Sequence, residues 1–173
     1  MPVDVIRHPT DVNVPRWSID AWRSGPRALV QIGWYLRNVR AIHQVPPPSG
    51  IRRCRLLLTG APVQSWEAAV ARHWRICGER TEHAGVTVLP RVRDAGYDRL
   101  LASCVVLAEF FDASANNLVL ECLVRGTPLV CNRHPAVVEH LGEDYPLYFD
   151  RIDDVPGLLT DSRIVAAHRT LMA

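Results

Sequence analysis

The chain alternates short apolar runs with longer segments of helical spacing, and this alternation constrains its fold more than any other feature. Six apolar runs are expected to form strands, at 28–32, 54–58, 86–89, 104–108, 128–131 and 147–149. Between and after them we expect helices at 34–44, 62–77, 94–102, 116–125, 136–141, 152–159 and 162–171. Strands that are apolar throughout and separated by single helices indicate a parallel sheet covered on both faces. We therefore predict an α/β fold: a doubly wound, mostly parallel Rossmann-like sheet of about six strands.

Residues 1–26 contain proline and tryptophan and lack clear periodicity. We interpret them as an N-terminal extension with one short helix at 19–23, followed by a single domain over 27–173. Trp17 and Trp22 have two interpretations. They either pin the extension to the domain or, together with Trp34, stack on a base or a sugar.

Composition limits the classes of partner that the chain can have. Hydrophobic residues make up 48% of its 173 residues and charged residues 22%, which favours a well-packed core over disorder. The net charge of +2 is too balanced to indicate nucleic acid or an anionic membrane as a partner. There are five cysteines without a CxxC spacing, no apolar signal core and no window near 18 apolar residues. We therefore expect a cytoplasmic protein with free buried thiols and no membrane span.

Ligands of doubly wound sheets bind at the carboxyl ends of the strands, where the strand order reverses. The loop after the 104–108 strand is the most informative of these positions. Ser114 and Asn116 are each suited to cap the helix that follows, and free N–H groups at a helix N-terminus can hold a diphosphate. Glu121 lies about one turn further, where a carboxylate can accept hydrogen bonds from ribose hydroxyls.

Four motifs together carry a resemblance to a known family. They are the run from Asn116 to Val130 with its Gly126-Thr-Pro128 turn, and the segments 97–103, 135–142 and 31–33. In this order and spacing they resemble the C-terminal, donor-binding half of group 1 GT-B-fold glycosyltransferases. The resemblance covers roughly residues 27–150, and it implies a single GT-B half-domain.

The resemblance implies roles for several residues in binding a nucleotide-diphosphate sugar. Glu121 would hold the donor ribose, and the N–H groups around Asn116, Asn117 and Leu118 would hold the diphosphate, with Ser114 beside them. Gly33 would let the first loop approach the phosphates.

A cation after the glycine loop and two sugar contacts complete the implied site. Arg37 or Arg40 would supply the cation, and Asp112 and His134 are candidate sugar contacts. Since a cation and a helix dipole can stabilise the leaving group, and no DxD motif or metal-ligand spacing of the histidines occurs, the resemblance implies metal-independent transfer without a cofactor.

The chain departs from the family pattern at three points. The first glutamate of the family's pair, which usually contacts the transferred sugar, falls at Ala113. The cation loop reads Gly33-Trp-Tyr-Leu-Arg37 in place of the common Gly-Arg followed by Lys. The length leaves no room for an acceptor-binding half, so we expect a fragment, a partner chain or homodimer that supplies this half, or a protein that is not an enzyme.

Two functional hypotheses follow. The chain is the donor-binding domain of a glycosyltransferase, or it is a non-catalytic nucleotide-sugar-binding or scaffold subunit that pairs with a partner protein. A receiver-like domain is a weaker third hypothesis, because the acidic cluster it needs at strand ends is replaced by Leu89-Pro90 after the third strand.

Overall fold

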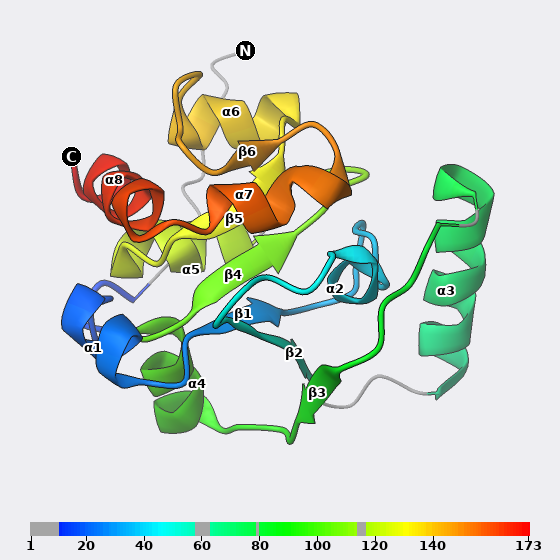
Figure 1. The fold of residues 1–173 in the computed structure, drawn as a ribbon, viewed down its shortest axis with the longest axis horizontal. Helices are drawn as coiled ribbons and strands as arrows, with labels where there is room; N and C mark the ends of the chain where they lie inside the picture. Colours follow the sequence, from blue (N-terminus) through cyan, green and yellow to red (C-terminus); the bar gives the residue numbers. More distant parts are fainter. Residues whose placement is uncertain (1–10, 58–62, 79, 114–116) are drawn as a thin grey trace, which may run out of the picture.

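The computed structural model describes residues 11–57, 63–78, 80–113 and 117–173, which form one six-stranded sheet flanked by helices (Figure 1). All of its strand pairs are parallel, in the order β3-β2-β1-β4-β5-β6. The strands are β1 (Ala28–Gln31), β2 (Arg52–Leu56), β3 (Val86–Leu89), β4 (Val105–Ala108), β5 (Leu129–Asn132) and β6 (Tyr148–Phe149). The predicted fold, a doubly wound parallel sheet of six strands, is confirmed.

The strand order places the switch point of the sheet between β1 and β4. The described helices are α1 (Ile19–Ser24), α2 (Ala41–Gln44), α3 (Val63–Cys77), α4 (Asp94–Leu101), α5 (Asn117–Arg125), α6 (Pro135–Leu141), η1 (Ile152–Asp154), α7 (Val155–Leu158) and α8 (Asp161–Met172). From β1 the chain proceeds to β2 on one side, whereas from β4 it proceeds to β5 on the other. The two strand ends at this reversal border the crevice in which such sheets bind ligands.

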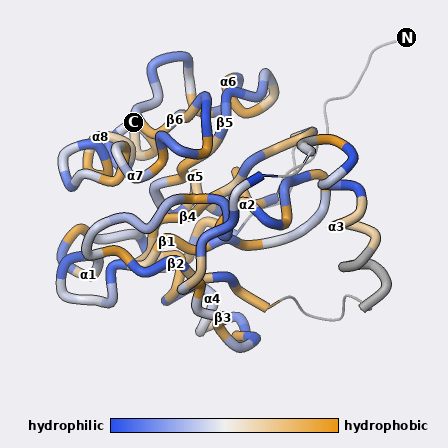
Figure 2. Tube along the Cα trace, turned by 45° about the vertical axis from the view of Figure 1, so that its right-hand side comes forward, coloured by the Kyte–Doolittle hydropathy of each residue, from blue (hydrophilic) through white to orange (hydrophobic). Residues whose placement is uncertain are grey.

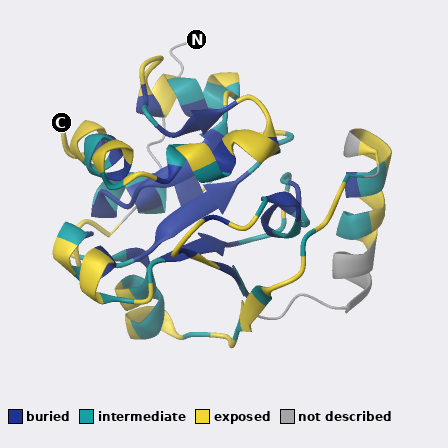
Figure 3. Cartoon of the chain, viewed as in Figure 1, coloured by how far each residue is buried: buried dark blue, intermediate teal, exposed yellow. Residues whose placement is uncertain are grey.

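The core is centred on β1 and β4, whose residues are mostly hydrophobic (Figure 2) and which are buried along their whole length (Figure 3). The side of the sheet formed by β2 and β3 differs from the expectation that all strands are apolar throughout. β2 carries three arginines, and Val88 of β3 is 52% exposed. Arg53 is buried and donates to the carbonyl of Val45 at 2.7 Å and to that of Ala84, so it anchors the segment that enters β3. Burial lowers the pKa of Arg53.

The N-terminal tryptophans belong to the core. The indole N–H of Trp17 donates to the carbonyl of Cys104 at 2.9 Å, and Trp22 is fully buried with its indole N–H 3.4 Å from a carboxylate oxygen of Asp161. Asp161 also pairs with Arg27 at 2.7 Å, which ties the segment around α1 to the start of α8. Of the two interpretations of Trp17 and Trp22, the structure shows the one in which they pin this segment to the domain.

The helix expected over 34–44 is wrong for most of its length, since only Ala41–Gln44 is helical. Leu36 has a φ of +56°, outside the helical region, and the loop pairs with the chain that leaves β4. The N–H of Asn38 donates to the carbonyl of Glu109 at 2.8 Å, and the N–H of Phe111 donates to that of Leu36 at 2.9 Å. These long-range hydrogen bonds replace the local ones of a helix.

Helix α3 lies apart from the other helices, on the side toward which β1 points (Figure 1). Among the residues of α3 whose burial is described, most are exposed or intermediate (Figure 3). His73 is the exception, because it is fully buried and lies 2.9 Å from the side-chain nitrogen of Gln44. Among the described side chains of α3, His73 contacts Gln44 of α2 and stacks on Phe111 in the chain that leaves β4.

Candidate functional site

A pocket of about 260 Å³ opens at the carboxyl ends of β1 and β4. It lies between the loop after β1, helix α3 and the chain that leaves β4. Its lining combines aromatic, apolar and cationic side chains, from Trp34, Tyr35, Leu36, Arg37, Ala68, Ala69, Arg72 and Phe111. Aromatic faces can stack on a base and guanidinium groups can hold phosphate, so this lining fits a nucleotide better than an uncharged apolar ligand.

Gly33 and Arg37 form one structural unit at this pocket. Gly33 has a φ of +80°, and a Cβ there would lie 2.7 Å from Nη1 of Arg37. The absent side chain lets Arg37 fold back, so that Nη1 donates to the carbonyl of Ile32 at 2.7 Å. The guanidinium carbon lies 5.6 Å from the ring centre of Phe110. The loop thereby holds a cation at the strand end where the sequence predicted one.

Burial lowers the pKa of Arg37, while the acidic groups of Tyr97, Cys122 and Glu121 act in the opposite direction. Glu121, to which the sequence assigned the ribose contact, lies on α5, which follows β4, the strand next to β1 in the sheet.

Helix α5 starts at Asn117, which is exposed, and Leu118 beside it is buried. Glu121 follows one turn later, and its Oε2 accepts a hydrogen bond from the hydroxyl of Tyr97 at 2.5 Å. Burial raises the pKa of Tyr97, and the adjacent Glu121 raises it further, so Tyr97 remains a donor that orients this carboxylate. Ser114 and Asn116 lie outside the described residues.

The structure places the remaining predicted residues around this core of the site. Arg40 forms a bidentate ion pair with Glu82, with Nε donating to Oε1 at 2.8 Å, so its guanidinium is engaged on the α2 side. That hydrogen bond lowers the pKa of Glu82. Asp112 is exposed on the chain that leaves β4. His134 precedes α6, and within the described structure its buried Nδ1 has no hydrogen-bond partner.

A buried network of polar side chains supports the loop after β1, and the sequence analysis did not identify it. Nδ2 of Asn38 donates to Oε1 of Gln44 at 2.8 Å and to Oε2 of Glu109 at 2.6 Å. Its Oδ1 accepts from the N–H of Arg40 at 2.8 Å. Gln31 binds both the carbonyl of Asn38 and the N–H of Ile42 at 2.8 Å. A glutamine inside an otherwise apolar strand was the one signal in the sequence that could have revealed it.

Glu109 connects this network to a second, polar pocket of about 420 Å³. Its carboxylate, 12% exposed, accepts hydrogen bonds from Nη1 of Arg80 at 2.8 and 3.1 Å. The pocket is lined by Arg80, Thr81, Glu109, Asp150, Arg151, Ile152 and Asp153. Over the described parts of the chain, no three His, Cys, Asp or Glu side chains converge as a metal site requires.

Comparisons with known proteins give a likeness of fold. No protein-family model matches the chain, and no curated protein matches it. A solved structure that does match is AviGT4, a glycosyltransferase involved in avilamycin A biosynthesis, with 19% identity and a TM-score of 0.50. The match covers 95% of this chain and 47% of AviGT4, so the chain spans about half the length of that protein. The fold is thus a Rossmann-like α/β half-domain of the GT-B type.

None of the described helices is long and apolar enough to cross a membrane.

Proposed function

We propose that the chain is the donor-binding half of a glycosyltransferase, which transfers a sugar from a nucleotide-diphosphate sugar without a metal ion. The observation that carries this proposal is the pocket at the switch point, where Arg37 and Arg72 lie among aromatic side chains. The GT-B-type fold and the glycosyltransferase activity of AviGT4 support it. The acceptor half would come from a partner chain or a second copy, and the free buried cysteines fit a protein of the cytoplasm.

In this proposal each donor group meets a side chain suited to it. The aromatic lining takes the base, and Glu121, oriented by Tyr97, accepts hydrogen bonds from the ribose hydroxyls. Arg37 and the N-terminus of α5 take the diphosphate. When the bond from the sugar to the diphosphate breaks, negative charge develops on the leaving group. A fixed cation and a helix dipole stabilise that charge, which is electrostatic catalysis.

A specific observation favours the second candidate, a non-catalytic nucleotide-sugar-binding or scaffold subunit. Ala113, at the position of the family's sugar-binding glutamate, is a buried side chain that offers no polar contact. A chain with this substitution could retain the nucleotide while losing the groups that direct the transferred sugar.

Calorimetric titration with UDP, GDP and their sugars tests the proposal. We expect one nucleotide to bind with a micromolar Kd and Glu121→Ala to raise this Kd at least about tenfold, because a charge-assisted hydrogen bond contributes about 1.5–3 kcal/mol. Glu143→Ala, on a side chain that is 82% exposed, is the matched control and should bind as the wild type does. Slow release of sugar from the bound donor would support the enzyme, whereas binding without turnover would favour the subunit. If no nucleotide binds, the donor-binding half and the nucleotide-sugar-binding subunit both fail, and only a scaffold subunit is left.

A further inference from the structure

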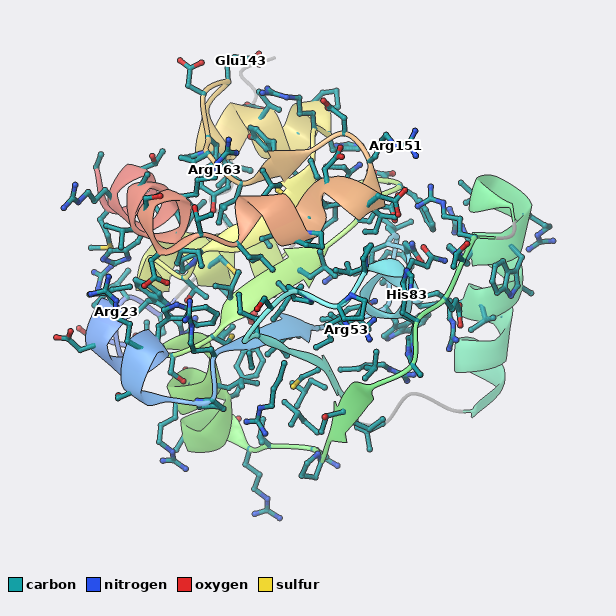
Figure 4. The ribbon with its side chains drawn as sticks, viewed as in Figure 1. Arg23, Arg53, His83, Glu143, Arg151 and Arg163 are labelled. Atoms are coloured by element: carbon teal, nitrogen blue, oxygen red, sulfur yellow. The ribbon has the colours of Figure 1, made fainter. Side chains whose placement is uncertain are left out.

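The polar pocket beside Glu109 is separate from the aromatic pocket and has a different character. Its walls come from three places in the chain: the segment between α3 and β3, the residue that follows β4, and the turn after β6 together with the start of η1. Figure 4 labels Arg151 on that turn. Its polar side chains are Arg80, Thr81, Glu109, Asp150, Arg151 and Asp153. Three carboxylates against two guanidinium groups give the pocket a formal charge of −1, which disfavours phosphate.

Glu109 is held in a fixed position, unlike an ordinary surface carboxylate. Arg80 donates to both of its oxygens, and Nδ2 of Asn38 donates to Oε2 at 2.6 Å. Asn38 is itself fully buried and bound to Gln44. A carboxylate positioned in this way loses little conformational entropy when it binds a ligand.

We propose that this pocket binds a saccharide ring, with Glu109 as the anchoring acceptor for its hydroxyls. The two oxygens of a carboxylate can accept hydrogen bonds from two neighbouring sugar hydroxyls. The side chains of Arg151 and Thr81 can donate hydrogen bonds to the ring oxygen and the hydroxyl oxygens. The volume of about 420 Å³ lies within the usual range for small-molecule sites. Ala113 leaves the family's usual carboxylate position without one, so Glu109 provides a carboxylate at the same edge of the sheet.

The choice of a sugar as the ligand rests on the proposed function. Two sources share this chemistry: the sugar transferred from the donor and the sugar of the acceptor. Binding of these two sugars depends differently on the nucleotide, because the transferred sugar is covalently attached to the nucleotide and the acceptor sugar is not.

Nuclear magnetic resonance titration of the ¹⁵N-labelled chain tests the proposal. The ligands are glucose, galactose, mannose and N-acetylglucosamine, first alone and then with UDP or GDP present. The corresponding nucleotide sugars follow, first alone and then with each free sugar added. We expect saturable shifts of the backbone amides of Thr81, Glu109 and residues 150–153 with one of these sugars. Extra shifts there with a nucleotide sugar, relative to its nucleotide, identify the transferred sugar, and shifts with a free sugar beside a bound nucleotide sugar identify the acceptor.

Variants connect the shifts to the pocket. Glu109→Gln keeps an acceptor for Asn38 but removes the charge, and we expect the Kd for the sugar to rise about tenfold. Asp150→Asn changes an exposed wall of the pocket and should weaken binding by a smaller factor without affecting the fold. Glu143→Gln should change nothing, because its exposed side chain lies outside this pocket.

The outcomes separate this proposal from the proposed function. If none of the sugars shifts the pocket, or if neither Glu109→Gln nor Asp150→Asn weakens the sugar, the saccharide pocket is overturned even when a nucleotide binds near Gly33 and Asn117. If a sugar shifts the pocket as expected while no nucleotide binds, the saccharide pocket stands and the proposed donor site fails.

Discussion

Replacing Asn38 with alanine would remove the centre of the buried network that supports the loop after β1. Asn38 is fully buried, and its side chain accepts from the N–H of Arg40 and donates to Gln44 and Glu109. Two of these bonds join neutral groups, at about 1 kcal/mol each, and the third reaches a carboxylate, at about 2 kcal/mol. The side-chain oxygen of Gln44 and the N–H of Arg40 would lose this partner, and Glu109 would keep only Arg80, so we expect the free energy of unfolding to fall by about 4 kcal/mol.

Urea denaturation followed by tryptophan fluorescence measures this loss, and the chain has five tryptophans. Asn13→Ala, at an exposed asparagine, is the control and should change stability by less than about 0.5 kcal/mol. Asn38→Asp keeps the shape but places a carboxylate against Glu109, which raises the pKa of the pair, so its cost relative to the wild type should shrink as the pH falls from about 7 to 5. A cost below about 1 kcal/mol for Asn38→Ala, or a pH-independent cost for Asn38→Asp, would show that Asn38 does not hold this network together.

Three further predictions concern stability. Trp22→Ala removes a fully buried indole and should cost about 3–5 kcal/mol in the same urea assay; a loss under about 1 kcal/mol would contradict its place in the core. Gly33→Ala forces a Cβ into a φ of +80° and against Arg37, so we expect about 1–2 kcal/mol of destabilisation, and an unchanged stability would show that the loop is not held as described. Burial lowers the pKa of His43 and His73, so below about pH 6.5 the unfolded chain binds more protons than the folded chain. The free energy of unfolding should therefore decrease as the pH is lowered, by at most about 1.4 kcal/mol per pH unit per histidine. Melting temperatures between pH 7 and 5 measure this, with a smaller slope expected in His73→Gln; a flat profile would argue against buried neutral histidines.

The sheet could be predicted because buried parallel strands have a strong local signal. The runs that became β1 and β4 are apolar at nearly every position, and the structure buries them completely. The prediction of a helix over 34–44 was wrong because it rested on the spacing of Leu36, Val39 and His43, which reflects only local sequence. Pairing with residues 109–112, about 70 positions away, overrides that pattern (109 − 38 = 71).

The candidate site divides in the same way. Gly33 and Arg37 lie in the loop after β1 and Glu121 lies one turn into α5, and the sheet topology places that loop and the start of α5 at the same edge. The network of Asn38 with Glu109 and the pocket beside it depend on side chains whose partners lie far away in sequence. No local spacing indicates which buried amide meets which carboxylate, so these features required the structure.

Hydrogen–deuterium exchange with and without saturating UDP or GDP tests whether a nucleoside diphosphate binds at the carboxyl edge of β1 and β4. We expect slower exchange in residues 33–38 and 117–121, which contain the glycine loop and the start of α5, and little change in α8. Protection confined to other segments, or none with either nucleotide, would contradict binding at this edge.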